Sequence, residues 1–333
     1  ALVTAQTTSA GNAGNILVQA DSVSITGGAQ ITSSSVIGNS GEIPTGNAGN
    51  ITIQGLAGSA ESVLISGVSL VGDILQPGGI FTTTSGTGTG GNISIAANTV
   101  TIQNGARLDA KSAGPAPEAR AGDIAVTADQ FTLAQGAQIN SSTFGPGSGG
   151  NVTIDAGQVQ LIGSGTTIKT ESNGAGHAGN VSMTANQVLA DTAEISANTS
   201  GTGNAGNISI LTNPAPGLVD EVHLTNGAKI SSTTQGTGLG GDIHVKTNNL
   251  TLENASITSA TVFPLDSIGG NAGNILAEVD TLTMTGGIIS TQSLFSSGRA
   301  GNVTINATKS ASISGSGDTQ GAIFTSTQGG PGD

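Results

Sequence analysis

The sequence predicts an all-β protein that winds as a right-handed parallel β-helix, with three short strands in each of about ten coils. A Gly-Asn or Gly-Asp pair followed by Ile or Val occurs ten times in 333 residues, about 32 residues apart. Within each repeat, apolar side chains alternate with polar ones in three short stretches, which is the pattern of strands with one buried face. Such an array is typical of a solenoid, and parallel crossovers favour the right hand.

The composition excludes several classes of protein. The chain carries 54 Gly, only 2% aromatic residues and no Cys. The lack of Cys excludes disulfide scaffolds, cysteine-based zinc modules and thiol catalysis. Eight Lys and Arg residues against 21 Asp and Glu give a net charge of −13, so the basic face of a nucleic-acid-binding protein is missing. No apolar run approaches the roughly 20 residues of a membrane-spanning helix.

The repeats predict one continuous array over residues 1–333, without an internal domain boundary. We expect both ends to be interrupted, as in a fragment of a longer chain, because residues 1–3 resemble the third strand of an incomplete coil. The coils are predicted to begin near Gly14, Gly49, Gly91, Gly122, Gly150, Gly179, Gly206, Gly241, Gly273 and Gly301.

The first stretch of each coil follows the Gly-Asn pair. Its first and third residues are apolar in all ten copies, and the residue between them is usually polar or small. We expect equivalent aliphatic side chains of neighbouring coils to form files inside a shared tubular core. The predicted core includes Ile16, Val18, Ile51, Ile53, Ile93, Ile95, Val152, Ile154, Ile208, Ile210, Val303 and Ile305.

The second and third stretches complete each coil. The second repeats the alternation, as in Val100 and Ile102, and the third reads small-x-large, as in Ala106 and Leu108. At roughly 1–2 kcal/mol for each Val or Ile side chain buried, about six inward residues per coil give a sufficient core. We expect a narrow bore without room for large rings. Strands about 4.8 Å apart make ten coils a rod of roughly 48 Å.

The corner between coils has a fixed sequence. Ala or Gly precedes the glycine, and the position before that is unrestricted, as Thr89 and Arg120 illustrate. Glycine suits a tight turn that leaves no room for Cβ. The Asn that follows either stacks its amide on the copies above and below or satisfies its own turn. In a stack, Asp123 and Asp242 would be weak points unless exposed, because a carboxylate cannot donate. The predicted column is Asn15, Asn50, Asn92, Asp123, Asn151, Asn180, Asn207, Asp242, Asn274 and Asn302.

These repeats resemble a known family. The block GNAGNI at residues 46–51 with its nine relatives, and the segment SVSITGGAQITSSS at residues 22–35, are similar to the repeat region of filamentous-haemagglutinin-like exoproteins of two-partner secretion. The resemblance is closest to long cyanobacterial members, some of them S-layer-type proteins, and it covers essentially the whole chain. It implies a β-helix in an extracellular protein at the bacterial cell surface. The family's amino-terminal secretion domain and signal peptide have no counterpart in these residues.

Catalysis is not predicted. Glycan-cleaving β-helix enzymes need clustered carboxylates or metal-bound acids, whereas the acids of this chain are dispersed. Asp191 and Glu194 are expected near one another, with Glu171 one coil away, and these three are the best catalytic candidates. We assign no catalytic, cofactor-binding or metal-binding residue, and no cofactor.

Other chemistry has little support in the sequence. His177, His223 and His244 occupy outward or loop positions and are interpreted as solvated residues. Outward Asp residues are candidate ligands for a loop-bound calcium ion, which needs several oxygen atoms together. Binding of sugars by aromatic stacking is not expected, because the chain has neither Trp nor Tyr.

The form of the molecule predicts its role. We expect a structural stalk or fibre segment of a secreted bacterial cell-surface protein, serving as an extracellular filament, coat or adhesin arm. Its expected partners are further coils of its parent chain or identical subunits stacked end to end, with cell-surface glycans as a further candidate. One alternative is an adhesin that binds surfaces or glycans through its coil faces. Another is a glycan-cleaving β-helix enzyme.

Overall fold

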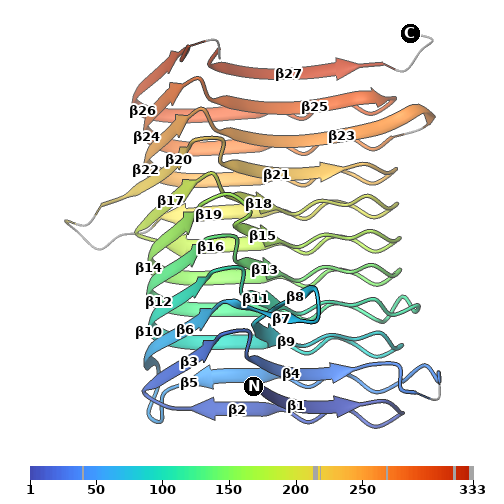
Figure 1. Ribbon diagram of the computed structural model, residues 1–333. Coiled ribbons are helices and arrows are strands. Elements are labelled where there is room, and N and C mark those ends of the chain that lie inside the picture. Colours follow the sequence, from blue (N-terminus) through green and yellow to red (C-terminus); the bar gives the residue numbers. More distant parts are fainter. Residues whose placement is uncertain (40, 213–216, 218, 268, 318–319, 330–333) are drawn as a thin grey trace.

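The computed structural model describes residues 1–39, 41–212, 217, 219–267, 269–317 and 320–329. The chain forms a parallel β-helix of about ten coils, which confirms the predicted fold class (Figure 1). The described residues contain strands, turns and loops but no helix, and therefore no helix long and apolar enough to cross a membrane.

The third stretches of the coils form a parallel sheet of 11 strands. Each strand between the two end strands pairs with its equivalents one coil below and one coil above, because the same stretch returns to the same place after each turn. The strands in order are β1 (Leu2–Thr7), β4 (Gln30–Ser35), β9 (Gly79–Phe81), β11 (Arg107–Asp109), β13 (Gln138–Asn140), β15 (Thr167–Lys169), β18 (Glu194–Ser196), β21 (Lys229–Thr234), β23 (Ser256–Ser267), β25 (Ile288–Ser296) and β27 (Ala322–Gln328).

The first and second stretches together form a sheet of 14 strands. Its strands are β2 (Ile16–Gln19), β3 (Ser22–Thr26), β5 (Ile51–Gln54), β6 (Ala60–Ser66), β10 (Ile93–Gln103), β12 (Ile124–Ala134), β14 (Val152–Ile162), β16 (Val181–Ala185), β17 (Gln187–Asp191), β19 (Ile208–Thr212), β20 (Glu221–Thr225), β22 (Ile243–Glu253), β24 (Ile275–Thr285) and β26 (Val303–Ser314).

Six coils differ from the expectation of three short strands. In β10, β12, β14, β22, β24 and β26, the first and second stretches run as a single strand of 11 or 12 residues. The reason is that the bend between the stretches interrupts the pairing for only one residue. Between β10 and β12, for example, Ala97 pairs with Ala128 and Thr99 with Gln130, and only Asn98 and its counterpart leave the ladder.

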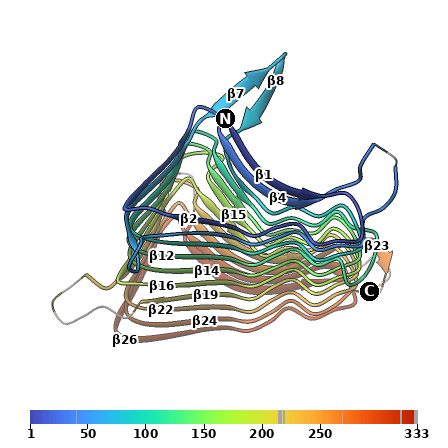
Figure 2. The same ribbon diagram turned by 90° about the horizontal axis from the view of Figure 1, so that it is seen from below.

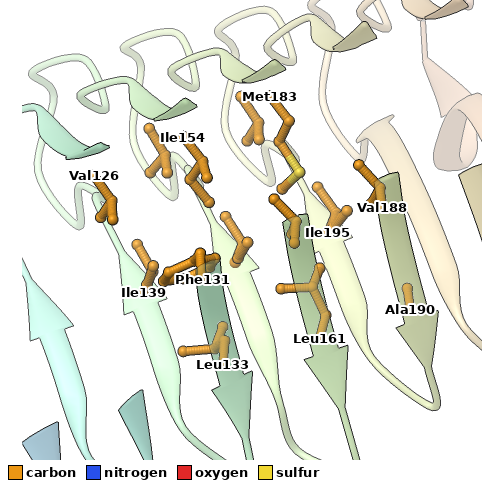
Figure 3. Packing of buried hydrophobic residues seen from close by; sticks show 14 of the residues in the cluster. Val126, Phe131, Leu133, Ile139, Ile154, Leu161, Met183, Val188, Ala190 and Ile195 are labelled. Atoms are coloured by element: carbon orange, nitrogen blue, oxygen red, sulfur yellow. The ribbon is translucent and has the colours of Figure 1, made fainter. Parts of the chain in front are cut away.

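The core is a file of aliphatic side chains along the axis of the helix (Figure 3). Ile16 pairs with Ile51, Ile51 with Ile93, and Ile93 with Ile124, so equivalent residues of successive coils lie on top of one another. The predicted core residues of the inner coils are at most 1% exposed; they are Ile51, Ile53, Ile93, Ile95, Val152, Ile154, Ile208 and Ile210.

The predicted core residues of the outermost coils are only partly buried. Ile16 and Val18 at one end, and Val303 and Ile305 at the other, pack against the core from a single side. The expectation that large rings would not fit is wrong at one position, because Phe131 is 1% exposed and lies among the aliphatic side chains (Figure 3).

One coil carries a hairpin that does not recur in the described residues of the other coils. Strands β7 (Val68–Val71) and β8 (Ile74–Pro77) pair antiparallel and project from the coil (Figure 2). Four aliphatic side chains at its tip are between 63% and 68% exposed; they are Leu70, Val71, Ile74 and Leu75.

Candidate functional site

The corner residues form one hydrogen-bonded column along the helix. The side-chain Oδ1 of Asn15 accepts from the backbone N–H of Asn50 at 2.8 Å, and Asn50 accepts from Asn92 in the same way. All nine links of the column have this geometry, from 2.7 to 3.0 Å. Each side chain therefore accepts a hydrogen bond from the corner N–H of the next coil, which has no backbone acceptor at the bend.

This geometry differs from both arrangements that the sequence left open, because the bonds join side chains to the backbone of the next coil. Asp123 and Asp242 fit the column because only an acceptor is required. Each accepts from the next backbone N–H at 2.7 Å, and also from the amide of Asn151 or Asn274 at 3.3 and 3.2 Å. A carboxylate is therefore not a weak point here.

A second column runs three residues before the first, at the position that the sequence analysis took as unrestricted. Asn12 accepts from the backbone N–H of Asn47 at 2.9 Å, and Asn47 accepts from that of Thr89 at 2.8 Å. Higher in the helix, His177 Nδ1 accepts from Asn204 at 2.8 Å. The signal in the sequence is the frequency of Asn at this position, at residues 12, 47, 204 and 271.

The two columns enclose an open groove with a volume of about 540 Å³ over the first four coils. One wall carries Asn12 and Asn47, the other Asn15 and Asn50, and buried Ala48 lies between them. The groove ends at the fourth coil with Arg120 and Asp123.

The glycine before each column residue is required by close contact between coils. A Cβ added at the corner glycines from Gly49 to Gly301 would lie 1.8–2.3 Å from the glycine carbonyl oxygen of the coil below. Gly14 has no such neighbour, and its Cβ would meet only Ala5 Cβ at 3.6 Å. None of these glycines has a positive φ, so the requirement comes from space and not from backbone conformation.

A column of buried hydroxyls lies beneath the corners, and the sequence analysis missed it. Seven side chains donate to corner-glycine carbonyls at 2.5–2.9 Å; they are Ser33, Thr82, Ser141, Thr170, Ser232, Ser259 and Thr291. All seven are fully buried or nearly so. The signal was a pair of Ser or Thr residues two apart, directly after the third stretch of most coils.

The outward face of the 11-stranded sheet carries a cluster of charges. Asp109 is 4% exposed, and its Oδ2 accepts from Lys111 Nζ at 2.9 Å. Burial raises the pKa of Asp109, although the nearby Lys111 and Arg107 act in the opposite direction. Asp109 Oδ1 and Arg107 Nε are buried without a partner among the described residues. Because these atoms are inaccessible, they offer a ligand no contact.

The three candidate catalytic acids do not form one cluster. Lys169 lies 3.5 Å from Glu171 and 4.0 Å from Glu194. Asp191 instead accepts from Thr192 and Asn226, at 3.0 Å each. Lys169 therefore links Glu171 and Glu194, whereas Asp191 is held by a hydroxyl and an amide apart from them.

The other candidates for chemistry are also dispersed. His223 lies 3.4 Å from Glu221 and 3.6 Å from Glu253, and His244 lies 2.9 Å from Glu278. The two histidines are partly exposed, and His177 is exposed. Within the described ranges, no group of three or more His, Asp or Glu side chains is arranged to hold a metal ion.

Comparisons of the chain with protein-family models, with curated proteins and with solved structures found no match in any of the three.

Proposed function

We propose that this chain is a structural segment of an extracellular fibre or stalk at a bacterial cell surface. The observation that carries the proposal is the continuity of the contacts along the axis. The aliphatic core, the corner column and the glycine contacts pass from coil to coil without interruption from Gly14 to Gly301. A molecule built in this way gains length without needing new kinds of contact.

Two further features support this role. The coils are held by hydrogen bonds of backbone and side chains, and the chain has no cysteine whose oxidation state would matter. The residues at positions 22–35 and 46–51 also resemble exoproteins of two-partner secretion, which would place the chain outside the cell.

Surface labelling of cells that produce the protein tests the proposal. Antibodies raised against the purified chain should label intact cells, and electron microscopy should show the label on filaments or on a surface layer. Brief treatment of intact cells with a protease that cleaves unfolded chains should leave the coils largely uncut. Labelling that requires broken cells, or label on compact particles inside them, would overturn the proposal.

A further inference from the structure

We propose that Asn173 is a site of spontaneous deamidation, at which the chain cyclises with Gly174 and opens again as aspartate or isoaspartate. This goes beyond the role of a fibre, because it assigns a covalent change to one position and not to others of the same local sequence. The chain contains three Asn-Gly pairs, at residues 104–105, 173–174 and 226–227. Asn-Gly is the most reactive pair in this chemistry, because glycine has no side chain to hinder ring closure.

The reaction needs no partner except water. The backbone nitrogen of the glycine loses its proton and attacks Cγ of the asparagine side chain, and the amide nitrogen leaves as ammonia. The product is a succinimide ring. Water then opens the ring at one of its carbonyl groups, which gives aspartate, or isoaspartate where the backbone continues through Cγ. Reactivity therefore depends on the glycine N–H, on the departing NH₂ group and on the carbonyl oxygen that becomes an oxyanion.

The first of the three pairs has both of its nitrogen atoms held. The N–H of Gly105 donates to the carbonyl of Gln135 in the next coil at 3.0 Å. The side-chain NH₂ of Asn104 donates to Ser66 Oγ at 2.9 Å. Ring closure at this pair must first break both hydrogen bonds, so the contacts of the folded chain protect it.

The third pair is held in the same way. The N–H of Gly227 donates to the carbonyl of Asn254 in the next coil at 2.8 Å. The side-chain NH₂ of Asn226 donates to Asp191 Oδ1 at 3.0 Å. The nucleophile and the leaving group are therefore both engaged here as well, and we expect the same protection.

At Asn173-Gly174 the contacts favour the reaction. Neither the N–H of Gly174 nor the NH₂ of Asn173 donates to any residue that the structure describes. Asn173 Oδ1 instead accepts from Ser200 Oγ of the next coil at 3.1 Å. A hydroxyl in this position stabilises the negative charge that develops on the oxygen when Cγ is attacked.

The surroundings of this pair also admit water without unfolding. Asn173 is exposed, and the pair lies in the loop between β15 and β16, so that ring closure breaks no strand pairing. Asn173 and Ser200 line a cavity of about 210 Å³ together with Asn198 and Thr199. Water in this cavity can reach the succinimide and open it.

Peptide mapping by mass spectrometry tests the proposal at all three pairs in one sample. The folded protein is incubated at mildly alkaline pH, and the fraction of aspartate and isoaspartate at each pair is followed with time. The same incubation in concentrated urea is the control, because unfolding removes the contacts and leaves three pairs with the same reacting atoms. Ser200→Ala removes the hydroxyl that faces Asn173, and Ser200→Thr is its matched control because it keeps one.

In the folded protein we expect Asn173 to react at least about tenfold faster than Asn104 and Asn226, and in urea the three rates should agree within about threefold. Ser200→Ala should slow the reaction at Asn173 by about threefold or more, whereas Ser200→Thr should change it by less than about twofold. Melting temperatures should confirm that both variants are folded.

Three results would overturn the proposal. The first is an unmodified Asn173 in folded protein under conditions where the urea control reacts. The second is the same order of rates in urea as in the folded protein, since the local sequence and not the fold would then explain it. The third is an unchanged rate at Asn173 in Ser200→Ala. None of these results affects the fibre role, which depends on surface location.

Discussion

At the scale of single residues, each corner is governed by backbone groups that the bend separates from their sheet partners. The corner N–H is met by a side-chain oxygen of the coil below, while the corner carbonyl accepts from the residue that follows the column in that coil. The preceding glycine lies so close to the carbonyl below it that no Cβ fits. A corner thus joins two coils through both a hydrogen bond and a close packing contact.

The glycine contact predicts different outcomes for one substitution at two equivalent positions. Gly150→Ala places Cβ 2.1 Å from the carbonyl oxygen of Gly122, and we expect it to lower the free energy of unfolding by at least about 3 kcal/mol. In Gly14→Ala the new Cβ meets only Ala5 Cβ, at 3.6 Å. We therefore expect this substitution to change the free energy of unfolding by less than about 0.5 kcal/mol. Urea unfolding measures the change in the free energy of unfolding for both variants. Equal changes would show that contact with the coil below is not the reason for glycine at the corner.

The buried carboxylate predicts a pH effect with a definite sign. Burial raises the pKa of Asp109 in the folded protein above its usual 3.8, so the folded state holds this proton more tightly than the unfolded state. Stability from this group is therefore lost as the pH rises from below 3.8 through the raised pKa. Asp109→Asn lacks the effect, so its stability relative to the unmodified protein should increase over that range and then level off. Urea midpoints at several pH values measure the difference; parallel pH profiles would contradict the prediction.

The sequence could predict the corner column but not the direction of its bonds. Gly and Asn recur at one place in each repeat, which is enough to align them along the axis. An Asn side chain offers both an acceptor and donors, however, so only the geometry of the bend decides which of them the neighbouring coil uses. The hydroxyls of Ser33 and Thr82 were missed for a related reason, since Ser and Thr near glycines are also typical of solvated turns.

At the scale of elements, the turn between the second and third stretches tolerates an insertion. In the first coil this turn is Gly27-Gly28, and both residues have positive φ. In the next coil, strands β7 and β8 are inserted at the same place, and the backbone N–H of Gly78 donates to the carbonyl of Gly67 at 2.9 Å. The hairpin is therefore closed at its base, and strand β6 of the coil that carries it keeps its pairing with both neighbouring coils.

Deletion of residues 68–77 should leave the fold intact. It joins Gly67 to Gly78 and recreates the Gly-Gly turn of the coil below. We expect an unfolding midpoint within a few degrees of the unmodified protein, because a two-stranded hairpin adds little stability. Binding of a hydrophobic dye should fall, since the exposed tip around Leu70 and Ile74 is removed. An unfolded product, or unchanged dye binding, would contradict this prediction.

The strands were predictable where apolar residues alternate and the hairpin was not. The period of two places Ile93 and Ile95 inside with no knowledge of the neighbouring coils. In the segment VSLVGDILQP at residues 68–77, the apolar side chains have no coil to pack against. A pattern that belongs to buried strands in the coils therefore belongs to exposed strands in this hairpin. The difference lies in what covers the strand, which the local sequence does not encode.

At the scale of the whole molecule, a coil is a removable unit. Deletion of residues 150–178 joins Gly149 to Gly179 and brings β12 beside β16 in the register that each already shares with β14. Because each coil contacts only its neighbours, we expect a folded protein with a slightly lower melting temperature, shorter by about 4.8 Å. Small-angle scattering and circular dichroism measure both quantities.

The control for this deletion removes only residues 150–164. This places strand residues opposite corner residues of the adjacent coils and moves inward side chains out of the core. We expect this variant to unfold or aggregate. If both deletions behave alike, the coil is not the unit of stability.

The side-chain bonds of the corner column from Asn15 to Asn302 all run the same way, from an acceptor in the earlier coil to a backbone donor in the later one. Growth of the helix is therefore directional: each finished turn is a template that already presents the groups the next turn needs. A chain that folds from its N-terminus can therefore add one turn at a time onto a completed edge, so that each new turn is fixed in register by the turn before it.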